Sequence, residues 1–560
     1  MLINTYAIFG ADGIIIRVEA DIRRGIPGID ITGLAEGAVR EARERVRAAF
    51  RNSGFVFPLD RVLINLAPAG LRKDGASLDL PIALAVMTAA GLIPQTGSGT
   101  LDAAASDEAA SDAELLVMGE LELSGRIRPV RGILAATAAA LKAGIREFIV
   151  PAENAREAAI LAPGRFAAAA TLAEAAHILA LRQETGSLPT GTMGTGIVVS
   201  GGAGSSGGAG RVSSDGSLRK DFAEVRGQER YKRALEIAAA GGHNLLVFGP
   251  PGTGKTMLAR RLPSIMAPLL PEEAVEVTRL HSLAGCTFGT SPGETSFVAE
   301  TEGRLIGHPP FRSPHHSASA EGILGGGKTV RPGEISLAHF GALFLDEAPE
   351  FRANVLQSLR EPLEDRVITI SRADGPVRLP ADFQLILAAN PCPCGRLGIR
   401  SNQGGQGCFC SPEEIRRYWR KFGAALLDRV ELRVAASSPE IEQMAKPGGE
   451  HSAAIARRVL TAVELQRERF KKTGIRRNAR MSTEMIEKFC LLSGNAETAF
   501  RTAAEKLGLS GRAYHGVLRV ARTIADLEGQ GSIKAVHILE AIQHRRQGDD
   551  PYDVFSAGSL

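Results

Sequence analysis

Hydrophobic and polar positions follow two periodicities in the first third of the 560-residue chain. Within residues 1–180, short apolar runs alternate with Ala-rich segments of helical spacing. The runs are Gly13–Ile16, Val62–Leu66 and Phe148–Val150, and Gly132–Ala143 is one of the helical segments. Short apolar runs are typical of strands, whereas apolar positions three and four residues apart are typical of helices. The pattern predicts one α/β domain.

Changes of pattern predict how the rest of the chain is organised. The polar stretch Gln95–Glu114 is expected to form a surface loop of the first domain. Residues 181–220 contain Gly/Ser repeats too poor in apolar surface to order themselves, which predicts a flexible linker. Residues 221–435 alternate buried strands and helices, as a parallel α/β core does. Residues 436–560 show helical spacing without a strand signal, so we expect an all-helical C-terminal lid.

A Gly-rich loop follows the first strand of the predicted core. The apolar run Leu245–Phe248 leads into it, and a helix is expected to begin near its last lysine. The loop comprises Gly249, Pro250, Pro251, Gly252, Thr253, Gly254, Lys255 and Thr256. In such loops backbone N–H groups converge on phosphate oxygens, the lysine contacts the β and γ phosphates, and the threonine hydroxyl binds Mg²⁺. The motif predicts the core of a P-loop ATPase, and an ordinary Gly-rich turn is the alternative.

Polar side chains follow two later strands of the predicted core. Ala342–Leu345 ends in Asp346 and Glu347, and Phe383–Ala388 is followed by Asn390. The carboxyl ends of parallel strands meet at the sheet edge where ligands bind. We therefore expect Asp346 to hold Mg²⁺ with the loop threonine, and Glu347 to polarise the attacking water. Asn390 is expected to contact the γ phosphate as a sensor, although asparagine after a strand is often only a turn former.

Composition and charge narrow the class of protein. Hydrophobic residues make up 44% and charged residues 23% of the chain, which is ordinary for a globular protein. The net charge of +4 is too small to predict a polyanionic partner. No apolar run approaches the ~20 residues of a membrane span, and Met1–Gly10 lacks the basic start of a signal peptide. We expect a multidomain cytoplasmic enzyme with no membrane partner.

Four of the six cysteines gather late in the predicted core. They form two pairs, Cys392-x-Cys394 and Cys408-x-Cys410, separated by a Gly-rich loop. Four thiolates can bind Zn²⁺ tetrahedrally, although two-residue spacers are commoner in zinc knuckles. A disulfide is the alternative, which a reducing cytoplasm disfavours. His315 and His316 are further candidate ligands, but packing within a loop is their simpler role.

Two predicted insertions carry basic residues. Ile368–Pro380 has a turn signal between β-prone flanks, which predicts a hairpin carrying Arg372 and Arg378. An earlier insertion carries Lys328 and Arg331 beside glycines. Cations on such loops can follow the phosphate backbone of DNA. Solvated loop charges are the alternative.

Residues 457–480 contain far more basic than acidic side chains. The basic residues are Arg457, Arg458, Arg467, Arg469, Lys471, Lys472, Arg476, Arg477 and Arg480, against Glu464 and Glu468. A local excess of this kind predicts a polyanionic partner, here DNA. A solvated helix face is the alternative.

Several motifs together carry a family resemblance. They are Phe311–His316, Gly325–Gly327, Arg331–His339, Phe344–Glu347, Ala389–Gly395 and Ala521–Leu527. On these motifs the chain resembles the YifB/ComM family of magnesium-chelatase-like AAA+ ATPases over nearly its whole length. The resemblance implies ATP and Mg²⁺ as cofactors and a ring of subunits, expected to be a hexamer.

The resemblance also implies two arginine roles. In that family and in related motors, a Leu-Leu-x-Arg segment donates an arginine to the neighbouring subunit's nucleotide. Leu426–Arg429 matches this segment, so Arg429 is expected to be the trans arginine finger, although its flanks depart from the family pattern. Arg512 matches the second sensor, which reports the γ-phosphate state to the lid. A surface ion pair at Arg429 and a plain helix-surface position at Arg512 are the alternatives.

The first domain resembles a different family. Lys73–Ser77 and Gly119–Ile145 are similar to the Lon-type serine protease domain, with Ser77 at the position of the nucleophile. The position of the lysine base falls on Ala136, and no neighbouring lysine replaces it. A serine hydroxyl needs a base to lose its proton near neutral pH. We therefore predict a domain that is inactive as a protease.

Together these features predict a ring-forming ATPase that moves on single-stranded or branched DNA. The resemblance implies a branch-migration helicase that aids integration of single-stranded DNA in recombination and natural transformation. One alternative is the ATPase motor of a magnesium chelatase, which the Lon-like head and the cysteine cluster disfavour. A second alternative is an assembly scaffold whose protease-like head binds partners.

Overall fold

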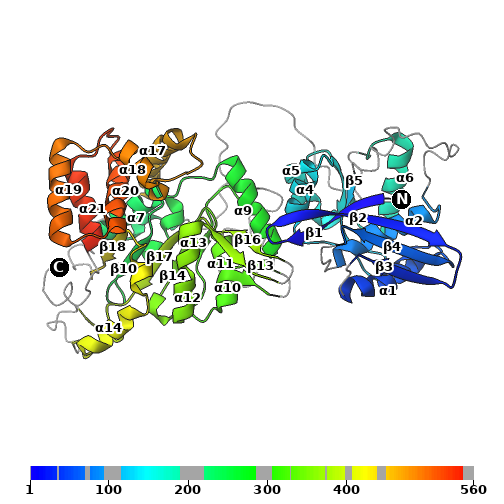
Figure 1. The fold of residues 1–560 in the computed structure, drawn as a ribbon, viewed down its shortest axis with the longest axis horizontal. Coiled ribbons are helices and arrows are strands. Elements are labelled where there is room, and N and C mark those ends of the chain that lie inside the picture. The colour runs from blue at the N-terminus through cyan, green and yellow to red at the C-terminus, as the bar shows by residue number, and fades with distance from the viewer. Residues whose placement is uncertain are drawn as a thin grey trace.

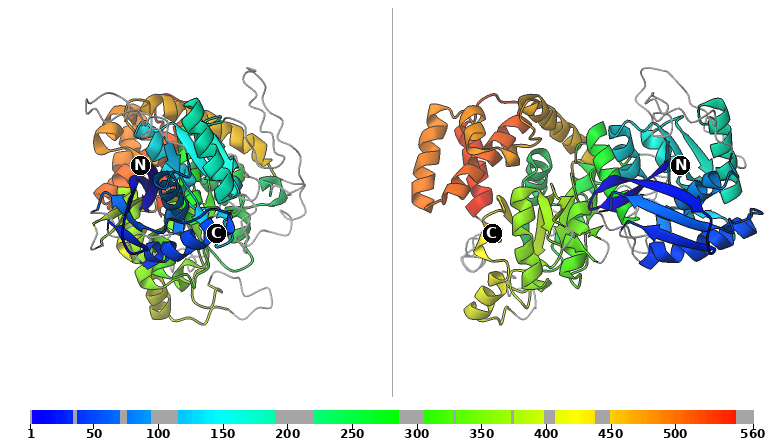
Figure 2. Two further views of the ribbon diagram at one scale, coloured as in Figure 1. Left: turned by 90° about the vertical axis from the view of Figure 1, so that its right-hand side faces the viewer. Right: turned by 45° about the vertical axis from the view of Figure 1, so that its right-hand side comes forward.

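The computed structural model describes three parts arranged along the long axis of the molecule. The described residues are 2–33, 37–69, 76–93, 115–189, 220–285, 305–327, 330–372, 375–397, 407–437 and 449–546. Figure 1 and the right-hand view of Figure 2 have an α/β head and a helical C-terminal part at opposite ends, with a second α/β part between them. The loop predicted at Gln95–Glu114 and most of the predicted linker lie outside the described residues.

The head contains a seven-stranded sheet in the order β3-β4-β2-β1-β5-β8-β9. Its strands are β1 (Leu2–Phe9), β2 (Asp12–Arg23), β3 (Gly28–Thr32), β4 (Arg61–Ala67), β5 (Leu115–Val117), β8 (Glu147–Pro151) and β9 (Phe166–Ala169). A short antiparallel pair, β6 (Glu120–Leu121) and β7 (Ile127–Arg128), lies beside it. In β4, every second residue is buried, namely Val62, Ile64 and Leu66. This alternation turns one face of the strand into the core.

Helices cover the head sheet. They are α1 (Gly37–Asn52), α2 (Asp79–Ala89), α4 (Ile133–Lys142), α5 (Ala155–Leu161) and α6 (Leu172–Thr185). The Ala-rich segment predicted at Gly132–Ala143 forms α4. Helix α6 runs to Thr185, and Leu188 is buried in the same core. The ordered head therefore continues past residue 180.

The middle part has a parallel sheet of five strands in the order β11-β14-β17-β10-β18. The strands are β10 (Leu245–Phe248), β11 (Phe311–Arg312), β14 (Ala342–Leu345), β17 (Gln384–Ala389) and β18 (Leu432–Ala435). Every position of β10, β14, β17 and β18 is buried, as expected when helices cover both faces of a parallel sheet. The mixed α/β class predicted from the sequence is thus confirmed.

The helices of the middle part are mostly short. They are α7 (Glu229–Gly241), α8 (Lys255–Ala259), α9 (Pro271–Ala284), α10 (Ala320–Leu324), α11 (Glu334–Leu337), α12 (Ala353–Ser358), α13 (Arg360–Asp365), α14 (Pro412–Arg420) and α15 (Ala424–Leu427). Helix α14 begins with a capping box, in which Ser411 and Glu414 each satisfy the backbone N–H of the other. Helix α8 opens directly from the Gly-rich loop.

Two short antiparallel pairs interrupt the strand and helix order. β12 (Gly325–Gly326) pairs with β13 (Arg331–Pro332), and β15 (Val367–Ile370) pairs with β16 (Val377–Pro380). The second pair coincides with the hairpin predicted at Ile368–Pro380. Ile368 and Leu379 face each other in it and are buried in the core of the middle part. The base of this hairpin is therefore anchored in that core.

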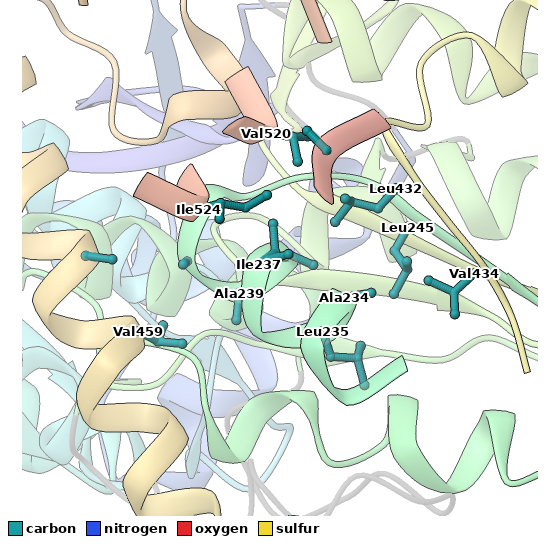
Figure 3. Packing of buried hydrophobic residues seen from close by; sticks show 14 of the residues in the cluster. Ala234, Leu235, Ile237, Ala239, Leu245, Leu432, Val434, Val459, Val520 and Ile524 are labelled. Carbon is teal, nitrogen blue, oxygen red and sulfur yellow. The ribbon is translucent and has the colours of Figure 1, made fainter. Parts of the chain in front are cut away.

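The C-terminal part is helical and shares a core with the middle part. Its helices are α17 (Ser452–Phe470), α18 (Thr483–Phe489), α19 (Gly494–Leu507), α20 (Gly511–Leu527) and α21 (Ala535–Arg546). Figure 3 shows Ile237 of α7 between Leu245 and Leu432 of the sheet and Val520 and Ile524 of α20. Among the described residues, no helix is long and apolar enough to span a bilayer.

The head contacts the middle part through α9 and the hairpin β15–β16. Figure 1 shows α9 between the two parts. The Ser282 hydroxyl on α9 donates to the buried Glu157 carboxylate of the head, and burial raises the pKa of Glu157. Gly10 of the head approaches Val377 of β16 so closely that a Cβ there would lie 2.6 Å from a Val377 methyl group. The head thus packs directly against the hairpin β15–β16.

Candidate nucleotide site

The Gly-rich loop joins β10 to α8 at the carboxyl edge of the middle sheet, where β14 and β17 also end. Gly254 precedes α8 with a φ of 84°, a backbone region that favours glycine. A Cβ at Gly249 would lie 2.2 Å from the carbonyl oxygen of Ala436, so glycine permits the close passage beside β18. The curled backbone is one in which successive N–H groups can converge on phosphate oxygens.

Lys255 lies at the centre of this edge. Its Nζ donates to the carbonyl oxygens of Gly249 (2.6 Å) and Pro250 (2.8 Å), and to Asn390 Oδ1 (3.2 Å). Burial lowers the pKa of Lys255 to about 8, against the opposing effect of the two nearby carboxylates. The structure therefore brings Lys255 and Asn390 together and holds the ammonium with uncharged oxygens.

Thr256 and Asp346 form a second contact at the same edge. The Thr256 hydroxyl donates to Asp346 Oδ2 at 2.7 Å, and hydroxyl and carboxylate oxygens are ligands that suit Mg²⁺. Glu347 follows in the left-handed region, with a φ of 49°, and its side chain is 58% exposed. His316 Nδ1 lies 3.8 Å from Glu347 Oε2, and the His316 ring stacks on His315. His316 thus lies beside the exposed carboxylate of Glu347.

Two residues that support the loop were missed by the sequence analysis. Gln228 donates through Nε2 to the carbonyl oxygens of Thr253 (3.1 Å) and Ser437. The buried Tyr231 hydroxyl donates to the Lys255 carbonyl at 3.1 Å. Both residues precede β10 and are brought to the loop by packing of α7. No motif in the sequence marks them.

Arg429 and Arg512 meet at another place, the carboxylate of Glu364. Arg429 pairs through Nη2 with Glu364 Oε2, and Arg512 donates through Nη2 to Glu364 Oε1 at 2.6 Å. Arg429 also donates to the Ala425 carbonyl at 2.6 Å, and Arg512 lies 3.7 Å from Asp428. Both arginines line a cavity of about 410 Å³. The structure groups the two arginines with each other, while Lys255 lies with Asn390.

The four clustered cysteines come together as a group. All four Sγ atoms lie within 4.8 Å of one another, and Cys392, Cys394 and Cys408 are separated by 3.4 to 3.6 Å. A tetrahedral site with Zn–S bonds of about 2.3 Å would separate its sulfurs by about 3.8 Å, so the thiols fit such an ion. Trp419 donates to the Pro391 carbonyl at 3.1 Å, and Gly395 packs against Pro251. The cluster thus borders the Gly-rich loop.

Of the four DNA-contact candidates, two have exposed side chains. Arg331 is exposed on β13 and Arg378 is exposed on β16. Arg372 follows β15 and is half-buried. Lys328 lies outside the described residues. The described candidates are therefore confined to the two antiparallel insertions.

The basic segment at residues 457–480 does not form the free cationic face that its sequence suggested. Its arginines mostly pair with acids from distant positions, as in Arg458–Glu236, Arg469–Asp526, Arg476–Glu273 and Arg480–Asp382. Burial lowers the pKa of Arg477 to about 10, and Arg467 donates to the Pro268 carbonyl. A count along the sequence misses these acids because folding supplies them. Arg457, Lys471 and Lys472 are exposed, so a polyanionic partner for this segment stays a prediction.

In the head, Ser77 lies in the single turn Ala76–Leu78, which leads into α2. Ala136 lies in α4 and is fully buried among apolar side chains. An alanine methyl group cannot accept a proton. The position at which the Lon-type resemblance expects a lysine base therefore has no basic group.

Three family models match the chain. The model for magnesium chelatase, subunit ChlI, matches residues 221–444, that for subunit ChlI of Mg-chelatase matches residues 18–154, and that for the ChlI C-terminal region matches residues 449–545. The parallel sheet, the phosphate-loop geometry and these matches define a magnesium-chelatase-like protein of the AAA+ class. This class indicates ATPase activity and the use of ATP and Mg²⁺.

Full-length relatives define the family more narrowly. The chain is 39% identical over 555 residues to the uncharacterized protein YifB of Salmonella typhimurium, covering 97% of this chain and 96% of the relative. It is 38% identical over 546 residues to competence protein ComM of Haemophilus influenzae, covering 97% of each chain. The chain belongs to the YifB/ComM family of magnesium-chelatase-like proteins.

A weaker and partial similarity concerns a protease. The chain is 29% identical over 197 residues to Lon protease 2 of Bacillus subtilis, which covers 31% of this chain and 33% of the protease. This match agrees with the predicted Lon-like character of part of the chain.

Proposed function

We propose that this chain assembles in the cytoplasm into a ring of six subunits and hydrolyses ATP to move on single-stranded or branched DNA. Its proposed activity is that of a branch-migration helicase. This activity aids integration of single-stranded DNA in recombination and natural transformation. The DNA part of the proposal rests on the full-length similarity to competence protein ComM and on the exposed Arg331 and Arg378.

The observation that carries the ATPase proposal is the pair of contacts at the sheet edge. Lys255 contacts Asn390, and Thr256 contacts Asp346. In the proposed reaction Lys255 binds the β and γ phosphates, and Thr256 and Asp346 hold Mg²⁺, which offsets charge on the phosphates. Glu347 is exposed beside this site and orients the attacking water. Asn390 moves with Lys255 when the γ phosphate arrives.

Arg429 and Arg512 supply the other half of the site in a neighbouring subunit. Within one chain both arginines are held at Glu364, whereas Lys255 is held with Asn390. A ring brings the arginine face of one chain against the Gly-rich loop of the next. The guanidinium groups then neutralise charge on the transferring phosphoryl group. This is why we propose a ring.

The test is an ATPase assay with and without single-stranded and branched DNA, together with a strand-displacement assay. We expect DNA to stimulate hydrolysis and ATP to drive displacement. Glu347→Gln should lower hydrolysis by about 10²-fold or more, because the water loses its base, while ATP binding persists. Glu350→Gln changes an exposed carboxylate nearby and is the matched control.

Three results would each contradict part of the proposal. Absence of both DNA binding and strand displacement would remove the DNA activity. Hydrolysis that DNA leaves unchanged would favour a chelatase motor, the alternative suggested by the names of the family models. Full DNA processing by the Glu347→Gln variant would favour a scaffold, since the motor would then be dispensable.

We further propose that Cys392, Cys394, Cys408 and Cys410 bind one structural Zn²⁺ beside the Gly-rich loop. Elemental analysis of the purified chain should find one zinc per subunit, and Cys408→Ser should lower that content. Cys490→Ser is the control, because Cys490 is a buried free cysteine outside the cluster. A zinc content unaffected by Cys408→Ser would refute the site.

We propose that the head acts without peptidase activity. Ala136 stands where a lysine base is needed and is enclosed by apolar side chains. The head also contacts α9 and β16, which suits a role in assembly or in guiding DNA. A peptidase assay with ATP decides the matter: cleavage that Ser77→Ala abolishes would refute this assignment.

A further inference from the structure

One carboxylate holds two arginines that come from separate regions of the chain. Glu364 lies in α13, Arg429 follows α15, and Arg512 is in the first turn of α20. Glu364 Oε2 pairs with the Arg429 guanidinium, and Glu364 Oε1 accepts a hydrogen bond from the Arg512 guanidinium. A phosphate presents its oxygens to two arginines in the same way. The carboxylate therefore occupies the position at which the pair would bind an anion.

The surroundings favour an anion at this position. The arginines lining the 410 Å³ cavity are Arg366, Arg429, Arg480, Arg512, Arg519 and Arg545, and the acids are Glu364, Asp428 and Glu431. Burial lowers the pKa of Arg366 and of Arg519, and the positive charge of neighbouring arginines, among them Arg480, lowers both further. Arg429 Nε and Arg519 Nε are buried without a hydrogen-bond partner among the described residues. Additional negative charge would be stabilised here.

Glu364 has space to leave the arginines. A second cavity, of about 570 Å³, is also lined by Glu364 and Arg429, so this ion pair borders both cavities. The Glu364 side chain is half exposed. The Arg512–Glu364 pair is therefore weak, because water competes for both of its charges. A polyphosphate with more negative charge can therefore displace the carboxylate toward the second cavity.

We propose that Glu364 is a positioning residue that holds Arg429 and Arg512 in the free subunit and gives them up to the triphosphate of the neighbouring subunit. This inference rests on the proposed function, because it assumes that the two arginines act in trans. Glu364 keeps the two side chains together and pointed into one cavity, which reduces the conformational entropy lost when phosphate binds. The same carboxylate competes with the phosphate. Its charge therefore weakens phosphate binding.

The first test measures phosphate binding in the 410 Å³ cavity lined by Arg429 and Arg512, here called the arginine cavity, without a contribution from the Gly-rich loop. Inorganic tripolyphosphate is titrated into the full chain carrying Lys255→Ala, with and without Glu364→Gln. We expect Glu364→Gln to tighten binding by about fivefold, the upper range for a partly exposed ion pair. Adding Arg512→Ala should remove the gain. Glu361→Gln, an exposed position on the same helix, should leave binding unchanged. Equal affinity with and without Glu364→Gln would overturn the inference.

The second test uses steady-state ATP hydrolysis by the assembled protein. Glu364→Gln should lower KM about fivefold and leave kcat within about twofold, with Glu364→Asp between it and the wild type. A fall in kcat at unchanged KM would overturn the inference, because Glu364 would then serve only to hold the fold. Arg429→Ala in the same assay separates the two proposals. If Arg429→Ala leaves kcat unchanged, the trans site itself fails.

Discussion

The Gly-rich loop and the arginine cavity are both suited to phosphate, but they hold their cations differently. Lys255 is held by two backbone carbonyls and the Asn390 side chain, all uncharged. Arg429 and Arg512 are held by the Glu364 carboxylate. A phosphate that reaches Lys255 displaces only neutral oxygens, whereas one that reaches the arginines must displace an anion. In a single chain, the half of the proposed site at Lys255 can therefore accept phosphate directly, whereas the Glu364 carboxylate occupies the arginine half.

The same difference suggests an order of events in the proposed ring. Nucleotide binds first at Lys255, because that half requires no ion pair to break. The bound triphosphate of one subunit then competes with Glu364 of the next for the two arginines. Nucleotide binding by an isolated subunit depends on the first step alone, whereas nucleotide affinity and hydrolysis in the ring depend on both steps. Removing a residue from either half should therefore affect different measurements.

The largest expected effect is that of Arg429→Ala on hydrolysis. Arginine fingers contribute about 10³-fold or more to kcat, because they neutralise charge that develops on the transferring phosphoryl group. We expect a loss of about 10³-fold in kcat, while nucleotide binding by the isolated subunit stays unchanged. Arg416→Ala, an exposed arginine on α14, is the matched control in a steady-state ATPase assay.

Mixing variants tests whether Arg429 acts in trans. Rings of Arg429→Ala subunits and rings of Lys255→Ala subunits should each be inactive. A mixture should regain activity, because an intact loop from the first variant can meet an intact arginine from the second. An inactive mixture, with mixed rings demonstrated by mass, would mean that Arg429 acts within its own chain.

A smaller loss is expected for Arg512→Ala. Arg512 is more exposed than Arg429 and is also near Asp428, so part of its charge is balanced elsewhere. Loss of one charge-assisted hydrogen bond corresponds to about ten- to a hundredfold in kcat. Nucleotide binding by the isolated subunit should again be unaffected. A loss of nucleotide binding without any loss of kcat would instead assign Arg512 to the loop of its own chain.

The loop half of the site could be predicted from the sequence because its signals are local. An apolar strand, eight loop residues and the start of a helix are contiguous, and Asp346 and Glu347 directly follow an apolar run. Parallel strands that end at one edge then bring Asn390 to Lys255. The α/β class follows from the same alternation of buried strands and helices. Residues that are adjacent in the sequence stay adjacent in the structure, so such patterns can be recognised from the sequence.

The arginine half could be predicted only in part. The resemblance supplied Arg429 and Arg512, but nothing distinguishes Glu364 from Glu361 in the sequence. Glu364 becomes their partner only because α13, α15 and α20 pack together in space. The charge balance of the basic segment could not be predicted for the same reason, since acids such as Asp526 reach its arginines through the fold. Charge pairs between distant positions are not visible along the sequence.

The extent of the helical lid also could not be predicted. Helical spacing identified the helices, but it could not indicate that α20 shares one apolar core with α7 and the sheet (Figure 3). His243 and Thr523 add a buried hydrogen bond of 2.8 Å between the two parts. The boundary predicted between residues 435 and 436 thus falls within a region whose buried side chains form one continuous core.

The smallest expected effect is a dependence of nucleotide affinity on pH, which arises at the Gly-rich loop. Burial lowers the pKa of Lys255 to about 8 in the nucleotide-free chain, whereas guanidinium groups stay charged at any ordinary pH. Bound phosphates favour the ammonium and raise this pKa, so nucleotide affinity is greatest below pH 8 and falls as the pH rises through it. Between pH 7.5 and 9 the charged fraction of Lys255 falls about eightfold, which sets the expected loss of affinity.

Binding titrations of ATP across this interval measure the effect. Lys255→Arg is the control, because its side chain keeps its charge and its affinity, whatever its absolute value, should not vary with pH. A wild-type affinity that is equally flat would mean that the Lys255 ammonium is not the group on which binding depends. The two halves of the site would then no longer differ in the way that their contacts imply.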